Sequence, residues 1–254
     1  MTKTVLVIGC SWSRSFEDPQ KDQEDTFWSW PELLAKDLGE DWNVWNYSSY
    51  CNSLEHQNLL LYWLLEKYHN VITHVILQHT SANRITMLED ALSYRRRIED
   101  INILKNTHKL NNYLQLPESL ATNCSATKPF DQLGAAHLNH GTVQNRKRWS
   151  STFQDMTLHY VGGTDHFGSI IQHDMKRLVE SYNKPCISYR HFYYPDFFKN
   201  TDVLNRDRSY LDFILQYDMP NFKDYTIDNG YHFSKSGNQR IVSDWILPRL
   251  LENV

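Results

Sequence analysis

The N-terminal third of the chain alternates between short apolar segments and longer segments with helical periodicity. The apolar segments are rich in β-branched and aromatic residues and cover residues 3–9, 41–46 and 71–78. The segments between them cover residues 25–38 and 53–68. Pro31 and Ser53 stand near the expected helix starts, and Gly39 stands where the first helix should end. A β-α-β-α-β order is typical of a parallel sheet covered by helices, so it predicts an α/β fold.

This rhythm changes after the third predicted strand. Residues 88–163 are polar, with helical pieces in residues 88–105 and a loop-like middle. We interpret this stretch as an insertion or cap within a single domain that spans residues 1–254. The α/β pattern then resumes with a helix over residues 164–182, a strand over 184–192 and a final helix over 236–251. Pro248 is expected to kink or shorten that last helix.

Length and charge bound the class of protein. At 254 residues the chain is long enough to bury a substantial core as one domain. Its formal net charge of −4 argues against a general binder of nucleic acids or anionic membranes. The basic clusters Arg95–Arg97 and Arg146–Arg148 are short, so we interpret them as solvated faces, with a local anion or partner contact as the alternative. The longest apolar run, Leu59–Leu65, is too short to span a membrane, and the N-terminus lacks a signal-peptide pattern.

Cysteine and histidine spacing gives no metal motif. The four cysteines form no C-x-x-C pair and are Cys10, Cys51, Cys124 and Cys186. We therefore expect reduced thiols and a cytoplasmic protein. The best histidine groupings are His137 with His140, and His159, His166 and His173. No Asp, Glu or Cys accompanies them at ligand spacing, so neither a metal nor a cofactor is predicted.

Two short segments at opposite ends of the chain carry residue types suited to nucleophilic catalysis. Val5–Ser11 puts a serine directly after a buried strand, where a tight turn exposes Oγ at the sheet edge. Asn229–Gly237 puts His232 just ahead of the final helix, where it can take the serine's proton. Alternatively, Ser11 caps a turn and His232 is a structural loop residue. Cys10 is expected to pack beneath the turn rather than act as the nucleophile.

These segments, with two others between them, resemble the SGNH/GDSL hydrolases, which are serine esterases. The family's Gly-Asp-Ser corresponds to Gly9-Cys10-Ser11, which makes Ser11 the candidate nucleophile. The family's Asn-x-x-x-x-Gly-x-Ser/Thr corresponds to residues 46–53, with Cys51 in the glycine position. The resemblance implies a flavodoxin-like, three-layer α/β/α fold with a central parallel sheet. It does not cover the polar, partly helical insertion described above.

The third block concerns the oxyanion hole. The family has Gly-x-Asn-Asp after its third strand, whereas this chain has Thr80 in the asparagine position, followed by Asn83 and Arg84. The resemblance implies that the N–H groups of Ser11 and Cys51, with Asn83 or Thr80, bind the oxyanion. Loss of one such donor costs about 10²–10³ in turnover, so Asn83, Thr80 or Arg84 has to replace the missing asparagine.

The last block is the family's Asp-x-x-His-x-Ser-x-x-Gly. His232, Ser234 and Gly237 match it, while Asn229 holds the acid position and Asp228 comes one residue earlier. Either Asp228 or Asn229 orients His232, or the site works as a Ser–His dyad.

Three further residues are assigned to the substrate pocket. Arg84 suits a phosphate, sulfate or carboxylate group, with a structural salt bridge as the alternative. Trp12 follows the serine and either lines the pocket or packs in the core. Asn52 belongs to the second block and is assigned to the same pocket.

The resemblance implies an esterase or acetylesterase that cleaves an O-acyl ester of a small molecule or carbohydrate. One rival is a catalytically degenerate protein that keeps the SGNH fold for binding or interaction, because the family's Gly, Asn and Asp positions are altered. A second rival is an enzyme that acts on phosphate or sulfate esters through Arg84. The sequence leaves the oligomeric state open.

Overall fold

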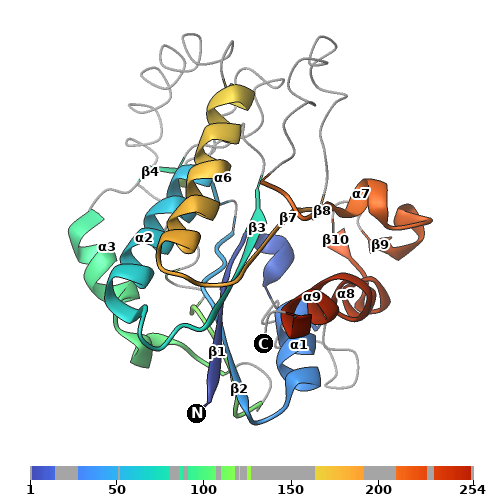
Figure 1. The fold of residues 1–254 in the computed structure, drawn as a ribbon, viewed down its shortest axis with the longest axis horizontal. Coiled ribbons are helices and arrows are strands. Elements are labelled where there is room, and N and C mark those ends of the chain that lie inside the picture. The colour runs from blue at the N-terminus through green and yellow to red at the C-terminus, as the bar shows by residue number, and fades with distance from the viewer. Residues whose placement is uncertain are drawn as a thin grey trace, which may run out of the picture.

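A six-stranded parallel sheet with helices on both faces forms the centre of the molecule, which confirms the predicted three-layer α/β fold (Figure 1). This computed structural model describes residues 2–14, 28–50, 52–80, 86–87, 91–106, 110–117, 120, 125–126, 164–191, 210–227 and 232–252. From edge to edge the strands are β5 (Tyr113–Gln115), β2 (Trp42–Asn46), β1 (Lys3–Ile8), β3 (His74–His79), β7 (Cys186–Arg190) and β8 (Phe213–Ile214). Every neighbouring pair is parallel.

The strand order reverses direction beside β1. The chain passes from β1 to β2 on one side and then crosses to β3 on the other side of β1. Apart from the edge strand β5, the order β2-β1-β3-β7-β8 is the flavodoxin-like one. In open α/β sheets, ligands bind outside the carboxyl ends of the strands at such a reversal. The residues that follow β1 and β3 are therefore the ones to inspect for a site.

Two helical layers cover the sheet. Helices α2 (Leu54–Tyr68) and α6 (Thr164–Ser181) lie on one face, and α1 (Trp30–Leu38), α8 (Lys235–Ile241) and α9 (Leu247–Glu252) lie on the other (Figure 1). Alternate residues of β1 point to opposite faces, so Leu6 and Ile8 pack on the α2 side, and Val5 and Val7 on the α1 side. Burial on both faces explains why β1 and β3 read as largely apolar runs.

Two helices begin at their predicted signals. Ser53 caps α2, since its hydroxyl accepts a hydrogen bond from the His56 N–H at 3.2 Å. Helix α1 begins one residue before Pro31. The Glu32 carboxylate accepts a hydrogen bond from the Ser29 N–H at 3.0 Å, which satisfies one of the N–H groups at the helix start. The predicted start at residue 25 is too early, because Trp28 and Ser29 are described and precede the helix. Residues 25–27 lie outside the described residues.

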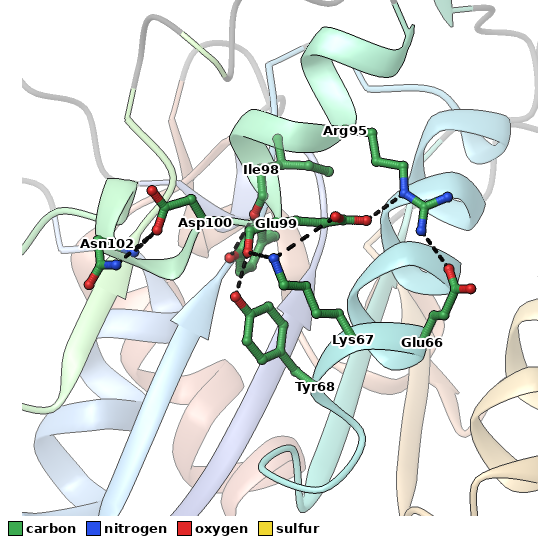
Figure 2. Close-up of polar contacts among 9 residues, drawn as sticks. Glu66, Lys67, Tyr68, Arg95, Ile98, Glu99, Asp100 and Asn102 are labelled. Carbon is green, nitrogen blue, oxygen red and sulfur yellow. Dashed lines mark hydrogen bonds and ion pairs between the residues drawn. The ribbon is translucent and has the colours of Figure 1, made fainter.

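Helix α3 (Ala91–Ile98), from the predicted insertion, is tied to α2 by ion pairs (Figure 2). Arg95 lies 2.6 Å from Glu66 of α2 and 2.5 Å from Glu99 one turn further along. The Tyr68 hydroxyl donates a hydrogen bond to the Glu99 carbonyl (Figure 2). The first residue of the basic cluster at positions 95–97 therefore holds α3 against α2.

Part of the predicted insertion belongs to the α/β core. Strand β5 lies within residues 88–163 and pairs with β2, with Val44 opposite Tyr113. On its outer side, the Gln115 backbone exchanges two hydrogen bonds of 2.8 Å with Lys105. This strand therefore belongs to the central sheet and not to a cap. Its three residues are too few to show the periodicity of a strand in the sequence.

The C-terminal residues form a hairpin followed by a helical segment. Strands β9 (Thr226–Ile227) and β10 (His232–Phe233) pair antiparallel, and α8 follows β10. Between α8 and α9, residues Val242–Ile246 form a π-helical turn, η7. The helix continues past Pro248, so this proline does not shorten it. The wider π-helical turn just before it accommodates the missing N–H group of the proline.

The other described elements are short. They are η1 (Ser11–Ser13), β4 (Thr86–Met87) paired with β6 (Ser125–Ala126), η2 (Ile101–Ile103), α7 (Leu215–Asp218) and η5 (Phe222–Tyr225). Among the described helices, none combines the length and the apolarity that crossing a membrane requires.

Gly237 allows α8 to approach the segment before the hairpin, and its replacement tests this packing. A Cβ there would lie 2.5 Å from the Tyr225 carbonyl oxygen and 2.7 Å from Cδ1 of Phe233. We expect Gly237→Ala to lower the free energy of unfolding by about 1–3 kcal/mol, measured by urea denaturation. The control, Lys235→Ala at an exposed position of the same turn, should change it by less than about 0.5 kcal/mol. Equal stability of the two variants would contradict the close approach.

Candidate active site

Ser11 is the one partly exposed residue of an otherwise buried segment. All residues from Thr4 to Arg14 except Ser11 are buried. Strand β1 ends at Ile8 and η1 begins at Ser11, so the turn brings Ser11 to the carboxyl edge of the sheet, beside the reversal in strand order. This is where α/β enzymes commonly present a nucleophile.

The carboxamide of Gln78, in β3, holds the turn around Ser11. Gln78 Oε1 accepts hydrogen bonds from the Cys10 N–H at 3.0 Å, the Cys10 thiol at 3.3 Å and the Ser13 hydroxyl at 3.1 Å. Its Nε2 donates to the His79 carbonyl at 2.8 Å. Cys10 therefore packs beneath the turn, as expected, with its thiol against this amide.

The loop after β2 closes on the same turn. Asn52 Nδ2 donates to the Gly9 carbonyl at 2.9 Å, and Asn52 Oδ1 lies 2.5 Å from Nδ1 of His56. The fully buried Arg14 donates to the Ser48 carbonyl at 2.7 Å. A Cβ on Gly9 would lie 2.8 Å from Oγ of Ser48, so the loops meet where only glycine fits. Asn52 is fully buried and positions the serine turn, while its contact with substrate stays a prediction.

The serine and histidine segments meet at a third residue, His191, which follows β7. Trp12, next to Ser11, packs edge-on against the His191 ring with the centroids 5.0 Å apart. Phe233, next to His232, packs on the same ring with the centroids 5.1 Å apart. His191 is fully buried, and Nε2 of His232 is buried as well. Two segments from opposite ends of the chain thus converge on one ring.

The other predicted site residues fall into two groups. Thr80 is buried at the end of β3, and its N–H donates to Oε1 of Gln57 at 3.4 Å, so an oxyanion would share this N–H with Gln57. Trp12 packs in the core with 7% of its surface exposed. The remaining candidates lie outside the described residues and are Cys51, Asn83, Arg84, Asp228 and Asn229.

Burial keeps three histidines near this edge uncharged at neutral pH. It lowers the pKa of His56 to about 3. It also lowers the pKa of His191 to about 3, with a further contribution from nearby His232. The pKa of His79 lies well below its ordinary value because of burial and then because of Arg190. The Nδ1–H group of an uncharged His56 can donate a hydrogen bond to Oδ1 of Asn52. The NH₂ group of Asn52 then donates to the Gly9 carbonyl.

A serine–histidine contact lies on the α6 side of the sheet, away from Ser11. His79 Nε2 and Ser188 Oγ are 2.7 Å apart, and these residues are 1% and 0% exposed. Because solvent does not reach Ser188, we interpret this pair as structural. Neither residue was predicted from the sequence as part of a site, and neither were Gln78 and His191. The signal that could have found them is a polar side chain in or just after a largely apolar strand.

Within the described ranges, no group of three His, Cys, Asp or Glu side chains is arranged to hold a metal ion. The histidines at 137, 140 and 159, which were among the best metal candidates, lie outside those ranges. Comparisons of the chain with protein-family models, with curated proteins and with solved structures found no match. Function is therefore inferred from the residues and geometry of the site.

The buried histidines predict a loss of stability in mild acid. Unfolded histidine binds a proton below about pH 6.5, whereas the folded chain keeps His56, His79 and His191 uncharged to lower pH. The contribution of these histidines to the free energy of unfolding should therefore be complete above about pH 6.5 and should be lost as the pH falls toward about 3. In this range, each of these histidines lowers the free energy of unfolding by about 1.4 kcal/mol for each pH unit. Urea denaturation across this range should show the loss begin near pH 6.5, and His191→Phe should reduce the slope by about a third. An unchanged slope would show that His191 does not titrate on unfolding.

Proposed function

We propose that the chain is a serine-dependent hydrolase that cleaves an O-acyl ester, with Ser11 as nucleophile and His232 as base. One observation carries this proposal: Trp12 and Phe233, the neighbours of those two residues, pack on the same His191 ring. A nucleophile and its base have to lie within reach of each other, and this packing brings their segments together. A partly exposed Ser11 at the reversal in strand order adds support.

The proposed reaction has two steps. Ser11 Oγ attacks the ester carbonyl carbon while His232 accepts the hydroxyl proton. The tetrahedral intermediate then expels the alcohol, which takes that proton and leaves an acyl group on Ser11. In the second step His232 activates a water molecule, which attacks the acyl-enzyme and releases the carboxylic acid and free Ser11.

Stabilisation of the oxyanion is assigned to backbone N–H groups. The N–H groups of Ser11 and Cys51 are the proposed donors, with Asn83 or Thr80 as a third. The hydrogen bonds that Gln78 accepts from the Cys10 N–H and that Asn52 donates to the Gly9 carbonyl support this role, because donors fixed before reaction need no reorganisation as charge develops. The described contacts leave the acyl group open, and a carbohydrate ester stays among the candidate substrates.

Reaction with a fluorophosphonate probe, read by intact mass, tests the nucleophile. We expect a single adduct on the wild-type chain and none on Ser11→Ala, because the probe needs an activated serine hydroxyl. Ser243→Ala, at an exposed serine of η7, is the matched control and should label like the wild type. His232→Gln should slow labelling by about 10²-fold or more, since it removes the base.

Thermal denaturation of each variant separates loss of the nucleophile from loss of the fold. Persistent labelling of folded Ser11→Ala would assign the reactive hydroxyl to another residue. No adduct on folded wild-type protein would favour the alternative, a binding protein on the same fold with a degenerate catalytic site.

The residue that orients His232 can be tested in the same assay. We expect Asp228→Asn to slow labelling by more than about tenfold and Asn229→Ala to have a smaller effect, because only a carboxylate stabilises the imidazolium. Labelling rates at fixed probe concentration measure both variants. If neither substitution changes the rate, Ser11 and His232 act as a dyad.

A further inference from the structure

A polar cluster lies at the carboxyl ends of β3 and β7, on the side of the sheet that α6 covers. His79 and Arg190 are direct neighbours across the two parallel strands. Arg190 Nη2 donates a hydrogen bond to Oε1 of Gln172, in α6. His79 also contacts Ser188, as described above. Three elements therefore bring a guanidinium, a carboxamide and an imidazole together.

Each of these three side chains keeps one buried polar atom without a hydrogen-bond partner among the described residues. The atoms are Nε of Arg190, Nε2 of Gln172 and Nδ1 of His79. Two of them are obligate donors, and the third donates when the Ser188 hydroxyl donates to Nε2 of His79. Buried donors are nearly always satisfied in folded proteins, so this group calls for a partner that accepts hydrogen bonds.

The charge of the cluster favours an anion as that partner. Lys176 Nζ lies 3.4 Å from Asp212, so these two charges offset each other. Within the described part of the chain, no carboxylate lies within ion-pair distance of Arg190. The low pKa of His79 has Arg190 and Lys176 among its causes, after burial, which agrees with a positive potential at this ring.

Arg190 connects the cluster with the surface at the carboxyl edge of the sheet, the edge at which Ser11 also lies. Arg190 is partly exposed, whereas Gln172 and His79 behind it are buried. His79 directly follows Gln78, whose side chain holds the turn around Ser11. A group bound at Arg190 would therefore lie at the same edge of the sheet as the proposed nucleophile.

We propose that Arg190, Gln172 and His79 form a binding subsite for an anionic oxygen group, of the carboxylate, sulfate or phosphate type. A guanidinium and an amide N–H together match the oxygens of such a group, and the uncharged imidazole can add a third hydrogen bond. As a subsite for the substrate it rests on the proposed hydrolase function, whereas the binding of the anion itself does not. The natural substrate would then be an ester that carries a negative charge away from the bond to be cleaved.

Isothermal titration calorimetry with inorganic sulfate, inorganic phosphate and acetate tests this site on the full chain at constant ionic strength. We expect at least one of these anions to bind saturably with one site per chain. Arg190→Gln should weaken that binding by about 10- to 100-fold, and Gln172→Leu by about two- to tenfold. Arg97→Gln, which removes an exposed guanidinium of α3, is the control and should bind like the wild type. If Arg190→Gln fails to fold, Arg190→Lys keeps the charge but loses the planar fork and should still bind more weakly.

The outcomes separate this site from the proposed reaction. Equal affinity of wild type and a folded Arg190 variant, or no saturable binding of any of the three anions, would overturn the subsite. Either result with intact fluorophosphonate labelling would leave the hydrolase proposal standing. Binding that depends on Arg190 in a chain that does not label would support an anion site and count against the esterase.

Discussion

The carboxamide of Gln78 joins the serine turn to the central sheet and satisfies groups that solvent does not reach. Its oxygen accepts from the Cys10 backbone and the Ser13 hydroxyl, and its nitrogen donates to the His79 carbonyl. A leucine of similar volume would leave these groups without partners, at a cost of about 1–3 kcal/mol for each buried polar group. This requirement explains why a polar residue, Gln78, stands next to the apolar residues Val75–Leu77 near the end of β3.

Two other carboxamides hold the same turn from the side of β2. Asn46 Nδ2 donates to the Ser13 carbonyl at 2.5 Å, and its Oδ1 accepts from the Ser48 N–H at 3.1 Å. Asn52 holds the Gly9 carbonyl in the same way. Three carboxamides thus hold the backbone on both sides of Ser11, and the proposed attack on a bound substrate requires such a fixed position. The polar interior at this edge therefore serves rigidity as well as hydrogen bonding.

The longer elements could be predicted from the sequence because their patterns are local. Burial on both faces leaves apolar runs in β1 and β3, and Ser53 marks the start of α2. Strands β5 and β8 could not be predicted, since two or three residues carry no periodicity and their pairing depends on neighbours distant in sequence.

The candidate site likewise has residues that the sequence suggests and residues that it does not. Ser11 and His232 could be picked out by residue type and by position next to a strand and a helix. His191 could not, because its role depends on two aromatic side chains that reach it only in the folded chain. Arg190 was hidden for a related reason, since it lies within a predicted strand and its neighbours belong to two other elements.

In the part of the chain that the structure describes, both edges of the central sheet offer little unpaired backbone to another molecule. An exposed edge strand presents unpaired N–H and C=O groups on which a strand of a second chain can add. Here β8 is two residues long, and the Gln115 backbone on the outer side of β5 is already bonded to Lys105. Among the described residues, the sheet therefore offers few unpaired backbone groups on which a strand of a second chain could add.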